Sequence, residues 1–158
     1  SHDDDTVEKV SLVKDSYGVH ISEFPVNMEV AKEARAQGLQ VVMGAPNILL
    51  GKSHSGNLSA LEAIKEDCVD ILCSDYYPSA MLHAVFKLYH EKILTLPRAV
   101  ALVTLNPARA LNVISDYGSL SSGKKADIVI VRMDGRIPLV SRTFISGRVA
   151  AQFQYRKG

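Results

Sequence analysis

Apolar and polar positions follow one rhythm over most of this chain and a second rhythm after about residue 115. In the first part, short apolar runs alternate with amphipathic stretches, and Gly, Pro, Asn or Asp residues separate them. The apolar runs predict strands at 19–24, 39–44 and 69–75. The amphipathic stretches predict helices at 5–18, 27–38, 57–67, 79–94 and 97–105. Such alternation with short connections is typical of a parallel sheet covered by helices, so the fold class is α/β.

Capping signals support the predicted helix ends. Asp5 can cap the first helix, with Glu8 three residues later as in a capping box, and Gly18 can end it. Asn27 is the expected cap of the second helix, and Pro97 suits a first helical turn.

The rhythm changes after the Gly- and Ser-rich segment SDYGSLSSGKK. Three strand-like segments follow, ADIVIVR, LVSRTFI and RVAAQFQ, with turns but no helix between them. We therefore expect an α/β part at 1–115 and a small antiparallel β-module at 116–158. A sheet of three parallel strands would leave at least one open edge, which is a site for association or aggregation.

Composition narrows the function classes. The 158 residues suit one domain, and the net charge of +1 comes from Lys and Arg spread along the chain. This distribution argues against a nucleic-acid or polybasic membrane surface, and no apolar run approaches the ~20 residues of a membrane helix. Cys68 and Cys73 are too few for a disulfide framework, so we expect two buried thiols in a reduced, cytoplasmic protein.

The segment GAPNILLGKSHSGN at 44–57 ends like a nucleotide-binding P-loop. The P-loop pattern needs Gly at position 46, but Pro46 has no N–H to offer a phosphate and cannot adopt a positive φ. We predict a loop there, between a strand and a helix, where parallel α/β folds bind ligands. It is either an anion-binding loop or a capped polar turn. Its candidate ligand-binding residues are Asn47, Lys52, Ser53, His54, Ser55, Gly56 and Asn57.

Other polar residues also follow strands. Asp75 and Tyr76 come after the third strand, where the carboxylate could cap the next helix or act as a metal ligand or general base. Glu23 ends the first strand, and His2 stands before three aspartates that could be a solvated helix start. Because parallel strands end at one rim, we predict that these residues and the 47–57 loop converge there.

At this point the sequence resembles the amidohydrolase superfamily. TLNPARALNV followed by YGSLSSGKKADIVIVR is similar to its closing signature. The segments SHDDDT, SEFP, MGAPN, GKSHSGN and CSDYYPSAML resemble, more closely, a phosphonate-metabolism branch of that superfamily. The resemblance implies the C-terminal half of a (β/α)8 TIM-like barrel followed by part of a β-sandwich.

The resemblance also implies an activity: release of diphosphate from the 5-triphosphate of a ribose 1-methylphosphonate, with a divalent metal ion as cofactor. Zinc is the first candidate, with manganese or another ion as alternatives. His2 and Glu23 would be metal ligands, and Asp75 a ligand or general base. The 47–57 loop and Tyr76 would hold the substrate.

The sequence departs from the superfamily pattern in one feature. Superfamily members carry a His-x-His pair after the first barrel strand, and this sequence has none. We therefore expect a chain that starts near the end of the fifth barrel strand, binds metal poorly and is inactive alone. Its open edges predict a homodimer or higher oligomer, and its pathway predicts association with other phosphonate-metabolism proteins. The alternatives are a hydrolase of C–N bonds in cyclic amides and a non-catalytic scaffold subunit.

Overall fold

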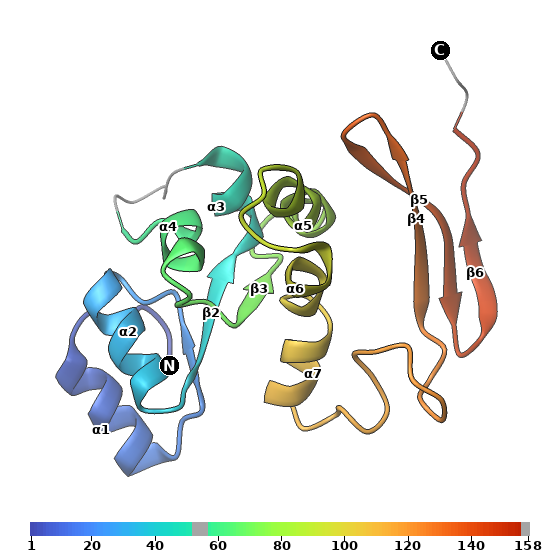
Figure 1. Ribbon diagram of the computed structural model, residues 1–158. Coiled ribbons are helices and arrows are strands. Elements are labelled where there is room, and N and C mark those ends of the chain that lie inside the picture. Colours follow the sequence, from blue (N-terminus) through green and yellow to red (C-terminus); the bar gives the residue numbers. More distant parts are fainter. Residues whose placement is uncertain (52–56, 156–158) are drawn as a thin grey trace.

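The computed structural model describes residues 1–51 and 57–155. The elements are shown in Figure 1. In chain order they are α1 (Val7–Tyr17), β1 (Ile21–Glu23), α2 (Met28–Ala36), β2 (Gln40–Gly44), α3 (Ala45–Leu50), α4 (Ala60–Lys65), β3 (Ile71–Cys73), α5 (Ala80–His90), α6 (Leu96–Ala101), α7 (Leu105–Ala110), β4 (Ile128–Asp134), β5 (Ile137–Ile145) and β6 (Arg148–Gln152). No helix in these described ranges is long and apolar enough to cross a bilayer.

The first three strands form the predicted parallel sheet. Their order is β1-β2-β3, and both pairs are parallel. Successive side chains of a strand point to opposite faces, so Val41, Met43 and Leu72 lie on one face and belong to the main buried core. Buried residues of α1 to α6 complete that core. The opposite face carries Glu23 and Cys73 near the carboxyl ends of β1 and β3.

The first three residues extend the sheet beyond β1. His2 and Glu23 form a parallel bridge, in which the Asp3 N–H donates to Glu23 O and the Glu23 N–H donates to Ser1 O, both at 2.9 Å. Asp4, next along the chain, is fully buried. The alternative of a solvated helix start therefore fails for Asp4, whereas Asp3 and Asp5 are more than half exposed.

Three predictions about helix ends have different outcomes. The Thr6 hydroxyl, and not Asp5, accepts from the first turn of α1, at 3.2 Å from the Lys9 N–H. Gly18 ends α1 at a φ of 62°, as predicted. The Asn27 side chain caps α2 and accepts from the Val30 N–H at 2.9 Å.

The predicted loop at 44–57 begins as a helix. α3 starts directly after Gly44, and Pro46 lies in its first turn, where its missing N–H leaves no helical bond unmade. Gly51 ends the helix at a φ of 72°. The loop prediction was wrong for Ala45–Leu50 because a six-residue helix is too short to show a clear period.

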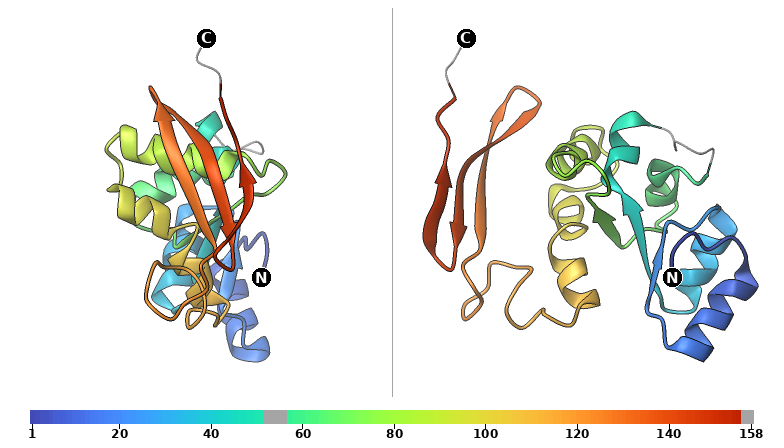
Figure 2. Two further views of the ribbon diagram at one scale, coloured as in Figure 1. Left: turned by 90° about the vertical axis from the view of Figure 1, so that its right-hand side faces the viewer. Right: turned by 180° about the vertical axis from the view of Figure 1, so that it is seen from behind.

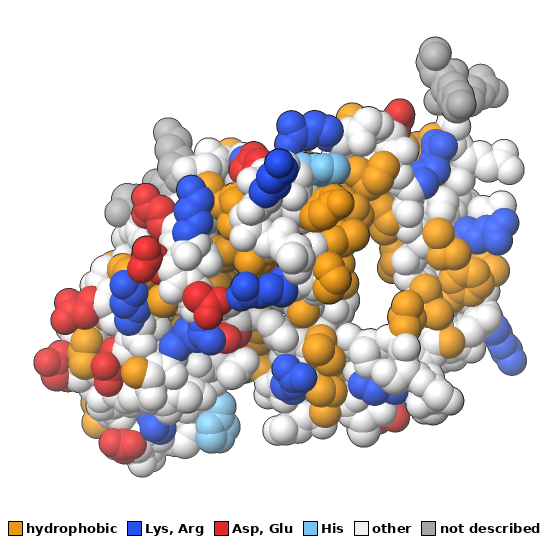
Figure 3. All heavy atoms as spheres, in the orientation of Figure 1, with side chains coloured by type: hydrophobic (Ala, Val, Ile, Leu, Met, Phe, Trp, Pro, Cys, Tyr) orange, Lys and Arg blue, Asp and Glu red, His pale blue; other side chains and the backbone are white. Residues whose placement is uncertain are grey.

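The β-module confirms the antiparallel prediction. β4 pairs with β5 and β5 with β6, each ladder with one irregularity in register. Figures 1 and 2 show this sheet beside α5 to α7, joined to them by an irregular connection. Between the two parts lies a largely apolar space of about 1100 Å³, and Figure 3 shows apolar side chains around it.

Candidate functional site

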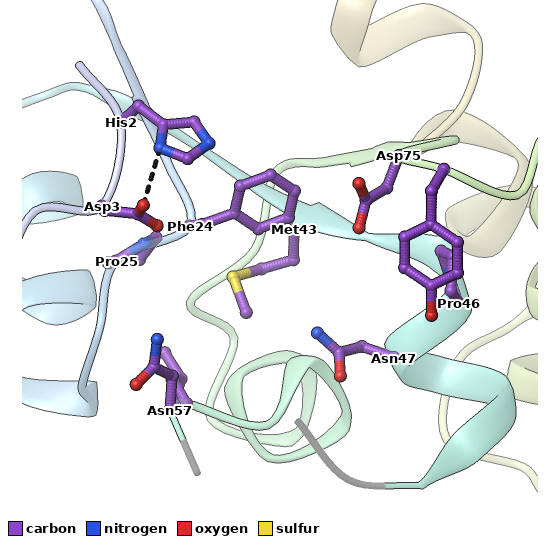
Figure 4. A pocket seen from close by; sticks show the side chains of 11 residues that line it. His2, Asp3, Phe24, Pro25, Met43, Pro46, Asn47, Asn57 and Asp75 are labelled. Carbon is purple, nitrogen blue, oxygen red and sulfur yellow. Dashed lines mark ion pairs between the residues drawn. The ribbon is translucent and has the colours of Figure 1, made fainter. Parts of the chain in front are cut away.

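A cavity of about 250 Å³ lies at the carboxyl ends of the parallel strands (Figure 4). Its walls come from the first residues of the chain, the ends of β1 and β2, the start of α3, the residues before α4 and the loop after β3. The lining residues are His2, Asp3, Phe24, Pro25, Met43, Pro46, Asn47, Asn57, Leu58, Asp75 and Tyr76. The structure thus brings together five residues that the sequence singled out: His2, Asn47, Asn57, Asp75 and Tyr76.

The His2 ring is held from several sides. Its Nδ1 lies 3.0 Å from Asp3 Oδ2, and its Nε2 lies 4.0 Å from Glu23 Oε2. The Phe24 ring meets it edge to face, with 5.3 Å between centroids. The His2 and Asp3 side chains are both more than half exposed, so their contact adds little to stability. The contact orients the ring, because a carboxylate at Nδ1 favours the tautomer with its hydrogen on Nδ1 and leaves Nε2 as an acceptor.

The Asp75 side chain occupies the space that a side chain on Gly44 would fill. A Cβ on Gly44 would lie 3.3 Å from Asp75 Oδ2 and 3.3 Å from Phe24 Cε1. Asp75 itself has a φ of 49°, a left-handed conformation that Asp tolerates better than most residues. The N-cap of α5 is Ser79, so Asp75 does not cap that helix. The glycine at the end of β2 therefore allows the carboxylate to pack against the strand.

Cys73 lies on the same sheet face as Glu23 and is half-buried. Burial raises the pKa of its thiol, the negative charges of Glu23 and Asp75 raise it further, and the Asp75 backbone N–H opposes the shift. Burial likewise raises the pKa of the Cys68 thiol, although Lys32 and Arg35 act in the opposite direction. Both thiols are therefore protonated at neutral pH and unsuited to act as nucleophiles.

The predicted metal ligands are only partly together. His2 and Asp75 line the cavity, whereas Glu23 lies beside His2 but does not line it. Within residues 1–51 and 57–155, no group of three or more His, Cys, Asp or Glu side chains could hold a metal ion. A catalytic zinc site takes about three protein ligands. The donors in the described part of the chain therefore do not fit a complete metal site.

Five predicted substrate-binding residues, Lys52, Ser53, His54, Ser55 and Gly56, lie outside the described residues. Sequence reasoning missed other lining residues. Asp3 could have been found from its position next to His2. Phe24 and Met43 could not, because an apolar residue in a strand gives no sign of which cavity it reaches.

Comparison with known proteins adds sequence and fold relationships. Residues 9–150 match the family described as "Amidohydrolase family". The chain is 46% identical over 140 residues to α-D-ribose 1-methylphosphonate 5-triphosphate diphosphatase of Escherichia coli (strain K12). That match covers 87% of this chain but only 36% of the relative, so the chain spans about a third of the relative's length.

Solved structures show the same fold at low identity. An amidohydrolase from Thermotoga maritima MSB8 has a TM-score of 0.75 at 19% identity, over 96% of this chain and 43% of its own. The guanine deaminase of E. coli has a TM-score of 0.57 at 18% identity, over 97% of this chain and 48% of its own. The family match extends through both the α/β part and most of the β-module, and so this chain belongs to the amidohydrolase family.

Proposed function

We propose that this chain is part of a metal-dependent hydrolase that releases diphosphate from ribose 1-methylphosphonate 5-triphosphate. The observation that carries the proposal is the cavity, in which His2, Asp75, Asn47 and Asn57 meet at the carboxyl ends of parallel strands. That position is where α/β folds hold their ligands. The 46% identity to the E. coli diphosphatase supports the choice of substrate.

The charge of the cavity supports a requirement for a cation. Its described lining contains two carboxyl groups, Asp3 and Asp75, and neither Lys nor Arg. A triphosphate carries several negative charges and would be repelled by these carboxylates at short range. A divalent ion would offset both sets of charges, and amidohydrolases are in general metal-dependent. Zinc is the first candidate, with donors from beyond the described residues completing its site.

The two asparagines and the segment that follows α3 are proposed to hold the substrate. The side-chain amides of Asn47 and Asn57 can donate to phosphate oxygens without adding charge. Lys52 and His54, which lie between these asparagines in the sequence, would contribute positive charge or hydrogen-bond donors. In this proposal Asp75 is a ligand or general base, and His2 and Glu23 are further ligands, with 4.0 Å between His2 Nε2 and Glu23 Oε2.

The proposal assigns activity to a longer catalytic unit. The chain alone, with too few described ligands, is expected to release diphosphate at least 100-fold more slowly than that unit. A chimera that joins the remaining portion of the E. coli relative to this chain tests the assignment. We expect it to release diphosphate when Zn²⁺ or Mn²⁺ is present and to lose that activity with a chelator.

Two variants of the chimera test the site. His2→Ala and Asp75→Asn should each lower the rate at least 100-fold, whereas His83→Ala should not, because His83 lies on α5 beside the larger apolar space. Hydrolysis of a cyclic amide in place of the triphosphate would replace this function with C–N chemistry. A folded chimera that shows no activity and no dependence on metal would indicate a scaffold subunit.

Homodimerisation is part of the proposal. Val129 and Ile145 lie on one face of the β-module, because Val129 pairs with Thr143, and each is more than half exposed. A second copy that covers this sheet would remove them from water. Sedimentation should show a dimer or larger species at micromolar concentration, and a stable monomer would contradict this part.

A further inference from the structure

Asp4 is a fully buried carboxyl group two residues after His2. Its Oδ2 accepts hydrogen bonds from the Ser1 and Ser22 hydroxyls, each at 2.6 Å. Its Oδ1 has no hydrogen-bond partner, and Lys9 Nζ lies 3.7 Å from it. Burying a charge is costly unless it is paired and hydrogen-bonded, so this arrangement requires a compensating role or neighbour.

Lys9 connects this carboxyl group to the backbone on either side of Asp3. Its Nζ donates to Asp3 O at 2.8 Å and lies 3.4 Å from His2 O. One ammonium group therefore faces the Asp4 carboxylate and the carbonyl groups that flank Asp3. Because α1 carries Lys9, the helix is tied to the short strand that presents His2.

A second chain of contacts reaches another part of the cavity wall. Asp4 O accepts from the Val26 N–H at 2.9 Å, and Val26 O accepts from the Leu58 N–H at 2.9 Å. Leu58 and its neighbour Asn57 both line the cavity. The peptide unit of Asp4 thus lies between the strand that carries His2 and the segment that carries Asn57.

The strand of His2 needs such support. Among the described residues it pairs on one side only, through three hydrogen bonds to β1: Asp3 N–H to Glu23 O, Glu23 N–H to Ser1 O, and the Ser1 amino group to Ile21 O. A pairing this short at a sheet edge opens readily on its own. The Ser22 hydroxyl, on β1, donates to the Asp4 side chain and so adds a further link between the His2 strand and β1.

We propose that Asp4 is a positioning residue, which acts through Ser22 and Lys9 to fix His2 against β1 at the cavity. The proposal rests on the proposed function in one respect, that His2 serves the site. It assigns a role to Asp4, which does not line the cavity. Asp5 is not given this role because its side chain is largely exposed, although its Oδ1 also lies near Lys9 Nζ, at 3.9 Å.

The test uses the full chain, with Asp4→Asn and Asp4→Ala compared with Asp5→Asn as the matched control. Hydrogen exchange at the Asp3 and Glu23 amides should become at least tenfold faster in the Asp4 variants, while exchange at Leu72, in the core strand β3, stays within twofold. The contact between the His2 and Phe24 rings, seen as a nuclear Overhauser effect, should be lost in these variants only.

Lys9 provides a test that leaves the buried carboxyl group in place, should the Asp4 variants fail to fold. Lys9→Met should accelerate exchange at Asp3 and Glu23, and Lys9→Arg should restore slow exchange because a charged donor remains. Unchanged exchange in the Asp4 variants, or equal acceleration at Leu72, would overturn the proposal. If His2→Ala leaves the chimera active while these exchange results hold, the proposed function fails and the positioning of His2 stands.

Discussion

Replacing Gly44 with Ala should disturb the Asp75 carboxyl group more than it disturbs the fold. The φ of Gly44 is −79°, which any residue adopts, so the added methyl group introduces no backbone strain. It would meet Asp75 Oδ2 at 3.3 Å, Phe24 Cε1 at 3.3 Å and Asp75 Cβ at 3.6 Å. Carbon atoms pack best at roughly 3.5–4.0 Å, so Asp75 and Phe24 must move by a few tenths of an ångström.

Two effects on the free energy of unfolding oppose each other. Overpacking costs about 1–3 kcal/mol, and replacing Gly with Ala in an unstrained position stabilises by about 0.4–1 kcal/mol through the unfolded chain. The expected net loss is therefore roughly 0–2.5 kcal/mol, measured by urea unfolding followed by circular dichroism. Diphosphate release by the chimera should fall roughly tenfold, because catalysis is sensitive to small displacements of a reacting group.

Gly18→Ala is the matched control. Gly18 has a φ of 62° with no atom within 4 Å of a built Cβ, so Ala there is strained but meets no neighbour. It should cost about 1–2 kcal/mol of stability and leave the rate of the chimera unchanged. If Gly44→Ala stabilises the chain and keeps full activity, the close packing of Asp75 on β2 has no functional consequence and the reasoning is wrong.

Three further predictions test local features. Asp3→Gly, which suits the φ of 50° but removes the carboxyl group, should abolish the Nδ1–H preference of the His2 ring in ¹⁵N NMR, whereas Asp3→Asn should retain it. The pKa of Cys73 is raised above its ordinary value of 9.0, so the folded state holds the proton more tightly and stability should fall as pH rises above about 9. Cys73→Ser should reduce the fall of the urea midpoint with rising pH. The same fall in the variant and the unchanged chain would contradict this prediction. Asp70→Ala should cost about 1–3 kcal/mol because Asp70 Oδ2 accepts from a backbone N–H at 2.9 Å. Glu66→Ala, which removes only an exposed ion pair to Lys32, should cost at most about 1 kcal/mol, and equal losses in urea unfolding would refute the distinction.

The succession of elements was largely predictable because each depends on neighbours in sequence. The strands at 19–24, 39–44 and 69–75 each contain an observed strand, and the Gly18 and Asn27 signals mark real helix ends. Errors occurred where two local solutions compete. Thr6 and Asp5 are both good caps, and only the path of the chain into the sheet decides between them.

The candidate site was predictable only in outline. Residues at the ends of parallel strands share a rim, so the meeting of His2 with Asp75 follows from strand order. The partners of each side chain do not follow. Glu23 lies beside His2 because their strands pair in that register, and a shift of one residue would have sent Glu23 to the other face.

The sequence by itself determined the α/β alternation, the change to an antiparallel β-module and the residue types gathered at one rim. These features depend on the period of apolar positions and on turn residues, which act over a few neighbours. Only the tertiary structure decided that Asp4 is buried while Asp5 is exposed, that Asp75 packs on Gly44, and that Asp3 faces the His2 ring. Those outcomes depend on register and on contacts between segments distant in sequence, and a local pattern carries no record of either.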